Sequence, residues 1–370
     1  MKSRILIPVS ILAVALLIAV FALDDGGSDE GGGNLPVPEP DDPYQEWMHV
    51  DASAGTVSFD GPVSWHVKDL LSPCYIKQGV QWVEYEGYGG EGDCIHLDPG
   101  FYRITVDGMS ADISIPGKVD RSAGWSFIFE GVSHSIDIAY SIDVDDLAGQ
   151  RSKGMDYNSG SRMHRFEDLP GMAAVTDDVT ALESLLESEF VRIGGDPENR
   201  QAYADFLASF VQCGISYPQS VYDGDERRGE DMSLYGSDEY WASPLETLNL
   251  VSGDCEDTSV LLCALYLAAG YDAAVGGKNG HVFAGVEIDG FQEVSKAELE
   301  ALDPYRVYKL TFSAPVEGFG DPDALFYAVE TIYSQLPVGY IGTVTFGSNT
   351  PWGITGFYQC HGAESGIQDP

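Results

Sequence analysis

Basic residues are scarce in this sequence. Lysine and arginine together number 19 in 370 residues, against 59 aspartates and glutamates, so the formal net charge is −40 at pH 7. A field of this sign repels the phosphates of nucleic acids and the headgroups of anionic lipids. The composition therefore argues against a nucleic-acid partner and indicates an acidic, strongly solvated surface, as in salt-adapted or cell-surface proteins.

Cysteine is also scarce, with six residues in the whole chain. Six are too few for a disulfide scaffold at this length. Cys74 and Cys94 are the pair that we expect to be bridged, because both fall in one loop-rich stretch of the first domain. Cys213, Cys263 and Cys360 remain unassigned.

Calcium loops of the recognised kind are absent too. The acidic stretches SIDVDDLAG and DGDERRGED lack the spaced carboxylates and the central glycine of such a loop. No cofactor or metal ligand is therefore predicted, and calcium stays an open alternative to which no residue is assigned.

One long uncharged apolar run lies at the amino terminus. Lys2 and Arg4 precede nineteen residues, 5–23, that carry no charge. This pattern indicates an export signal, whose length suits an uncleaved membrane anchor, whereas VFA at 20–22 would suit cleavage. We expect residues 1–23 to be an anchor or signal peptide, and the rest of the chain to lie outside the cell, tethered or secreted.

The next segments read as a linker and an all-β domain. Residues 24–43 combine Gly, Pro and acids without an apolar period, which is typical of an extended linker. Residues 44–150 contain short alternating runs broken by Gly and Pro, such as GTVSF, FYRITVDG and SIDIAYSID, at the spacing of a small antiparallel β-sandwich. Residues 151–175 are polar and aperiodic, and predict a second linker.

A second domain is predicted over residues 176–350, followed by a tail over 351–370. It opens with two helical patterns, one capped by Thr176 and one with Pro197 at its start. A long surface loop follows over 218–242, a length that is often functional in compact domains.

The stretch SGDCEDTSVLLCALYLAAG, residues 252–270, places Cys255 at the start of an apolar helix. A cysteine standing alone is most often a small buried residue. In the first helical turn, however, unpaired backbone N–H groups and the positive end of the dipole favour a thiolate. Glu256 and Asp257 act in the opposite direction, because nearby negative charge raises the pKa of a thiol.

The stretch YDAAVGGKNGHVFAGVEI predicts a strand, a Gly-rich turn and a second strand that begins at His281. A core helix packed on a sheet brings its N-terminus to one end of the strands, so Cys255 and His281 are expected to meet. A thiol and an imidazole within hydrogen-bond reach form an acyl-transfer pair.

A third group is expected to orient the imidazole, normally a carboxylate on an adjacent strand. Glu330 in the apolar strand LFYAVETIY, residues 325–333, fits best. Asp289 is the main competitor, but it lies eight residues beyond His281 on the same strand. An extended strand would place it more than about 20 Å from His281. Asp303 of ALDPY is a weaker option, as a turn residue.

The string EYWASPLETLNLVSGDCEDTSVLLCALYLAAGYDAAV, followed by GHVFAGVEI, resembles the core of the transglutaminase-like superfamily, whose members are papain-like folds with a Cys-His-Asp triad. The match is specific over about 239–288 and loose over about 197–342. Carried over by motif, the resemblance implies that Cys255 is the nucleophile, His281 the base and Glu330 the residue at the position of the usual aspartate.

Two features depart from the family pattern: the acid is Glu instead of Asp, and residues 289–325 are inserted before its strand. An oxyanion hole needs donors aimed at the developing charge, and the backbone N–H of Cys255 is the first of them. Gln212 and Trp241 are the candidate side-chain donors, although each residue type at such a position is more often a helix-end or core residue.

The sequence thus predicts an α+β protein, in which an all-β sandwich-like domain precedes a papain-like transglutaminase core of helices packed on an antiparallel sheet. The predicted function is a membrane-tethered extracellular thiol enzyme that cleaves or exchanges amide bonds of a protein or peptide substrate through a thioester. Hydrolysis is favoured, because water is abundant outside the cell and no lysine-binding site is identified. The alternative is a non-catalytic cell-surface binding or assembly module with the same fold.

Overall fold

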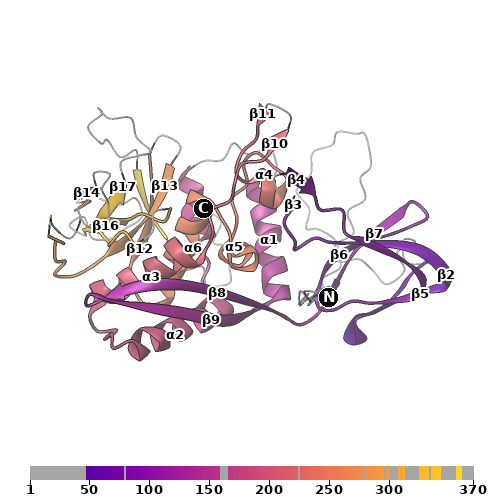
Figure 1. Cartoon of the computed structure of the whole chain (residues 1–370), viewed down its shortest axis with the longest axis horizontal. Helices are drawn as coiled ribbons and strands as arrows, with labels where there is room; N and C mark the ends of the chain where they lie inside the picture. Colours follow the sequence, from indigo (N-terminus) through magenta and orange to yellow (C-terminus); the bar gives the residue numbers. More distant parts are fainter. Residues whose placement is uncertain are drawn as a thin grey trace, which may run out of the picture. The chain divides into compact units, whose positions relative to one another are not determined.

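The structure, a computed structural model, describes residues 47–78, 81–158, 166–223, 226–278, 281–295, 297, 299, 307–309, 311–312, 325–332, 335–342 and 356–360. The predicted anchor over 1–23 and the linker over 24–43 lie outside these residues. None of the helices in the described part of the chain is long and apolar enough to cross a membrane. The protein is α+β, with an antiparallel β region followed by helices packed with a mixed sheet (Figure 1).

The first compact unit is an antiparallel sheet of five strands that curls into a half-barrel. Its hydrogen-bonding path is β1, β2, β6 and β7, and β5 also pairs with β2. The register of β2 with β5 shifts between Ser58 and Val63, and such an irregularity bends a strand. The bounds are β1 (His49–Asp51), β2 (Thr56–Asp69), β5 (Tyr88–His96), β6 (Gly100–Val106) and β7 (Met109–Ile115), with a short η2 (Ala52–Ala54).

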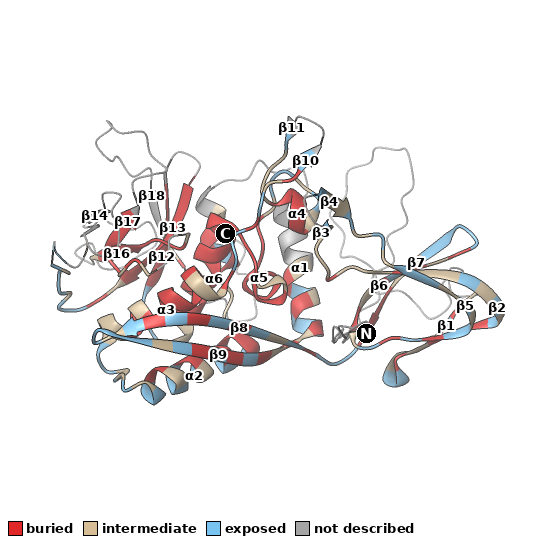
Figure 2. Cartoon of the chain, viewed as in Figure 1, coloured by how far each residue is buried: buried red, intermediate tan, exposed pale blue. Residues whose placement is uncertain are grey.

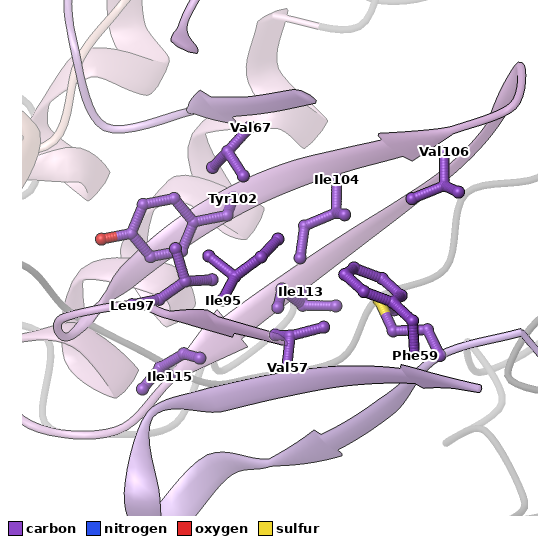
Figure 3. Packing of buried hydrophobic residues seen from close by; sticks show 11 residues of the cluster. Val57, Phe59, Val67, Ile95, Leu97, Tyr102, Ile104, Val106, Ile113 and Ile115 are labelled. Carbon is purple, nitrogen blue, oxygen red and sulfur yellow. The ribbon is translucent and has the colours of Figure 1, made fainter. Parts of the chain in front are cut away.

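The concave side of this sheet holds its core. Side chains two residues apart share one face of a strand, so alternate positions of each strand point inward. Figure 3 shows how these apolar side chains meet inside the curl. The fully buried members include Val57, Val67 and Ile104.

The β-sandwich predicted over residues 44–150 lacks its second sheet in the residues that the structure describes. The last two strands of this range, β8 (Lys118–Phe129) and β9 (Val132–Asp143), form a separate hairpin, most of which belongs to the second compact unit. Trp125 packs on Phe206 and Phe210, with ring centroids 5.9 and 5.3 Å away. Its indole N–H donates to Ser209 Oγ at 3.0 Å. Phe129 likewise packs on Phe190 of α2. The aromatic side chains on one face of the hairpin therefore pack on helices α2 and α3, over which the hairpin lies in Figure 1.

The second unit contains helices α2 (Asp177–Arg192), α3 (Arg200–Gly214), α4 (Met232–Tyr235), α5 (Pro244–Leu250) and α6 (Cys255–Ala268), with η3 (Phe166–Met172). Helix α1 (Val144–Asn158) begins in the first unit and continues into the second. Two short hairpins accompany them, formed by β3 (Tyr75–Gln78) with β4 (Gln81–Glu84) and by β10 (Tyr222–Asp223) with β11 (Glu226–Arg227). Helix α1 and η3 occupy most of the described part of the predicted linker 151–175.

The sheet of the second unit has seven strands in the order β14, β17, β16, β13, β12 and β18, with β15 paired to β16. The sequence predicts an antiparallel sheet, but this sheet is mixed, because β16 and β17 run parallel. Strands β14 and β15 lie in the predicted insertion, and β18 lies in the predicted tail. The bounds are β12 (Ala273–Lys278), β13 (His281–Glu287), β14 (Val307–Lys309), β15 (Thr311–Phe312), β16 (Phe326–Val329), β17 (Tyr340–Gly342) and β18 (Gly356–Gln359).

Helix α6 is the centre of this unit. It packs against α2, α3, α5 and η3, and against strands β12 and β13. Every residue from Cys255 to Tyr266 is buried, and Figure 2 shows this helix almost wholly in the buried colour. Full burial of a Val or Leu side chain contributes about 1.5–3 kcal/mol, so Val260, Leu261 and Leu265 hold the helix firmly.

The six cysteines all lie in the described part of the chain and form no disulfide with one another. Cys74 and Cys94, the pair predicted to be bridged, form no disulfide, and they belong to different compact units. The backbone N–H of Cys74 donates to Leu234 O at 3.0 Å in the second unit. Cys94 lies in strand β5 of the first unit, where it is the register partner of Ser58 in β2. Cys360 instead lies beside Cys263, in the core of the second unit.

Asp205 on α3 yields a pH-dependent prediction. Its Oδ1 accepts the Val338 backbone N–H at 2.6 Å, and burial raises the pKa of this half-buried carboxyl to about 7. Since the ordinary pKa is about 3.9, the folded state holds the proton more tightly, and the stability that it contributes is complete below about pH 4 and lost as the pH rises through 7.

Asp205→Asn keeps the acceptor and removes the charge. We expect the variant to match the wild type near pH 4 and to exceed it by about 1–3 kcal/mol above pH 7. Urea unfolding at several pH values measures this difference, and a difference that does not vary with pH would contradict the shift.

Candidate active site

Cys255 is the first residue of α6, after the N-cap residue Asp254. The chain reaches it through a strained turn, because Val251 adopts φ 49° and ψ 33° in the left-handed region, which a β-branched residue rarely occupies. Ser216 holds this turn from both sides: its N–H donates to Val251 O at 3.0 Å, and its carbonyl accepts from Gly253 N at 3.2 Å. The turn brings the sulfur to the N-terminal end of the buried helix.

The thiol of Cys255 is buried, with 8% of the residue exposed. Its Sγ donates to Glu256 Oε2 at 3.0 Å, and the backbone N–H of Val282 also contacts the sulfur. Val282 follows His281 in β13, so the start of α6 lies beside the start of this strand.

His281 is 3% exposed and lies at the first position of β13. Its Nε2 lies 3.1 and 3.2 Å from the two carboxylate oxygens of Glu330. The register explains the contact: Ala284 pairs with Val329, so Glu330 continues β16 opposite Phe283, two residues from His281 on the same face. An ionised carboxylate only accepts hydrogen bonds, so beside an ionised Glu330 the tautomer with the proton on Nε2 is favoured, and this tautomer leaves Nδ1 as the basic nitrogen.

Glu330 is completely buried and firmly held. Its Oε1 accepts the Thr331 backbone N–H at 3.0 Å. The side chain of Gln212 donates to Glu330 O at 2.8 Å and to Leu336 O at 2.9 Å, which fixes the loop after β16. The competing acid Asp289 is exposed at the far end of β13, and Asp303 lies outside the described residues.

The two candidate oxyanion donors have other partners. Both N–H groups of Gln212 are used on backbone carbonyls, so Gln212 positions Glu330 and does not serve as the predicted donor. Trp241 Nε1 donates to Glu239 Oε1 at 3.3 Å, and Glu239 is hydrogen-bonded to Glu256. Trp241 is thus linked to the thiol through two carboxylates.

Burial and acidic neighbours together set the electrostatics of the thiol. Burial, followed by the charges of Glu256 and Asp254, raises the pKa of Cys255 well above its ordinary value. Sequence analysis predicts this direction with Glu256 and Asp257 as the cause. In the structure Asp257 instead accepts the Ala242 backbone N–H at 2.7 Å, and Asp254 takes its place.

A cluster of three buried aspartates at the start of α6 was not predicted. Asp231, Asp254 and Asp257 each offer an oxygen within 4.8 Å of the others, a spacing that suits a metal ion. Asp254, Cys255 and Glu256 form a second such group. The acidic stretch DGDERRGED ends in Asp231, but it lacks the ligand spacing of a calcium loop, and its distance from GDCED in the chain gives no sign that the two stretches meet.

An open cleft of about 730 Å³ lies beside Tyr217. Burial and, next, the charge of Cys255 raise the pKa of Tyr217, which places this side chain near the thiol. Tyr217 is therefore a cleft residue that lies near the thiol. Its lining residues are Lys77, Gln81, Trp82, Tyr217, Pro218, Gln219, Ser220, Tyr222 and Glu230.

No protein-family model, no curated protein and no solved structure matches the chain.

Glu256→Gln tests the electrostatics of the thiol. Removing the carboxylate that accepts its hydrogen bond should increase the alkylation rate of Cys255 by iodoacetamide at pH 7 about tenfold, which corresponds to about one pKa unit. Mass spectrometry of the labelled peptide gives the rate. Glu187→Gln, at an exposed acid on α2, is the control, and equal rates in both variants would refute the assignment.

Proposed function

We propose that this chain is a transglutaminase-like thiol enzyme that cleaves or exchanges amide bonds of a protein or peptide through a thioester on Cys255. The observation that carries the proposal is the buried His281–Glu330 pair, held where the Val282 N–H meets the sulfur. The order of elements supports the same reading, since a buried helix begins at Cys255 and the antiparallel strands β12, β13 and β16 lie beside it.

The proposed reaction begins with Cys255 as a neutral thiol. When the thiol turns from Glu256 toward His281, Nδ1 takes its proton while sulfur attacks the carbonyl carbon. The tetrahedral oxyanion is stabilised by backbone N–H groups at the start of α6. The imidazolium then protonates the departing amine, which leaves a thioester on Cys255. A water molecule, deprotonated by the same ring, attacks the thioester and releases the acid and the thiol.

Glu330 fixes the ring and stabilises the imidazolium. A carboxylate bonded to Nε2 keeps Nδ1 available for the thiol proton and offsets the positive charge that develops on the ring. Glutamate is one methylene longer than the usual aspartate, and the contacts from Thr331 and Gln212 hold this longer residue in place.

The cleft suggests an extended peptide as the substrate. Trp82, Tyr217 and Tyr222 supply aromatic surface along it, and Tyr217 lies next to the thiol. Hydrolysis is favoured over exchange, because water is abundant outside the cell and the sequence identifies no lysine-binding site. With residues 1–23 as the anchor, the enzyme would be tethered to the membrane and act outside the cell.

A non-catalytic binding module is the second candidate. The observation in its favour is that the thiol is hydrogen-bonded to Glu256 and buried among carboxylates, which disfavours a thiolate. In that case Cys255 and His281 would be remnants of a catalytic ancestor.

Acylation by 4-nitrophenyl acetate separates the two candidates. We expect release of nitrophenol with a transient acetyl group on Cys255, because His281 accepts the thiol proton. His281→Ala should lower the acylation rate about 10²–10⁴-fold, and Glu330→Gln should lower it less. Intact-mass spectrometry and absorbance follow both products.

Cys94→Ser is the matched control, since Cys94 is an exposed thiol outside the site and its loss should change nothing. Acylation that is equally slow in the wild type and both site variants would support the binding module instead.

A further inference from the structure

The three aspartates near Cys255 are placed by the starts of two helices. Asp231 is the N-cap residue of α4 and Asp254 that of α6, yet neither side chain caps its own helix. Asp257 lies in the first turn of α6. All three are at least nine-tenths buried, with exposed fractions of 1%, 9% and 0% in chain order.

One oxygen of each carboxylate has no hydrogen-bond partner. Asp231 Oδ2 accepts the Tyr240 N–H at 2.8 Å, and Asp257 Oδ1 accepts the Ala242 N–H at 2.7 Å. Asp231 Oδ1, Asp254 Oδ1 and Asp257 Oδ2 are buried without a partner, as is the hydroxyl of Tyr235. Buried polar atoms are normally satisfied, so these orphaned oxygens indicate a ligand between them.

The charge of the cluster points the same way. Among the described residues, no lysine or arginine forms an ion pair with any of the three aspartates. Glu256 and Glu246 add further negative charge beside Asp257. Removing several like charges from water is unfavourable unless a cation or protons neutralise them.

The oxygen ligands and their burial select the kind of cation. Hard divalent ions take carboxylate oxygens, and Ca²⁺ accepts several carboxylates in one site, whereas Mg²⁺ keeps several waters and rarely occupies an all-protein cage. The three aspartates offer oxygens within 4.8 Å of one another. We propose that Asp231, Asp254 and Asp257 bind a divalent cation of the calcium type.

Such an ion would join α4 to the first turn of α6. The loop that carries Asp231 also carries Glu230, which lines the cleft, so the ion would tie one wall of the cleft to the helix of Cys255. This site does not depend on Cys255 being a nucleophile, and it would be equally useful to a binding module.

Thermal unfolding of the full-length chain tests the site. After chelation, calcium chloride is added in concentrated KCl, which screens diffuse binding by the acidic surface. We expect Tm to rise by several degrees and to saturate, and magnesium chloride to give a smaller rise at equal concentration.

Asp231→Asn and Asp257→Asn should lose this rise. Without calcium both should be at least as stable as the wild type, because each removes one of three repelling charges. Asp177→Asn, an exposed aspartate in the first turn of α2, should keep the full response.

Several results would overturn the proposal. No saturable rise in the wild type, or an equal rise in Asp231→Asn, would mean that protons neutralise the cluster. An equal response to magnesium would refute the calcium type. The readout is Tm and not acylation, so failure here is distinguishable from failure of the proposed enzyme.

Discussion

The burial of α6 is the constraint on which the rest of the site depends. This helix is surrounded by other helices and by two central strands, and its first residue is Cys255. Its packing therefore sets where the sulfur, the start of β13 and the end of β16 meet. The same burial removes Glu256, Asp254 and Asp257 from water, which makes their charges effective at short range.

Two opposed demands follow from this geometry. A nucleophilic thiol needs a proton acceptor, which His281 with Glu330 behind it can supply. The acidic cluster, in contrast, favours the protonated thiol and requires a neutralising partner of its own. A cation among the three aspartates would ease the second demand while leaving the His281–Glu330 pair untouched.

Much of the local structure near Cys255 could be predicted from the sequence. The apolar run after GDCED predicts the helix, and the strand start at His281 follows from the Gly-rich turn before it. Glu330 was inferred from one apolar strand with one acid, and the register of β13 with β16 brings it to the ring.

Long-range pairings could not be predicted in this way. Period-two alternation in β8 and β9 shows that one face is buried, but not that Trp125 packs on helices of the second unit and not on the first sheet. Gln212 and Asp231 owe their positions to contacts with segments distant in sequence, and neither contact leaves a periodic pattern in the chain.

The alkylation rate of Cys255 as a function of pH, compared between the wild type, His281→Ala and Glu330→Gln, tests the central claim most directly. If His281 serves the thiol, His281→Ala should slow labelling across the neutral range, and Glu330→Gln should do so to a smaller extent. Identical profiles in all three proteins would contradict the account, because the imidazole would then have no influence on the sulfur.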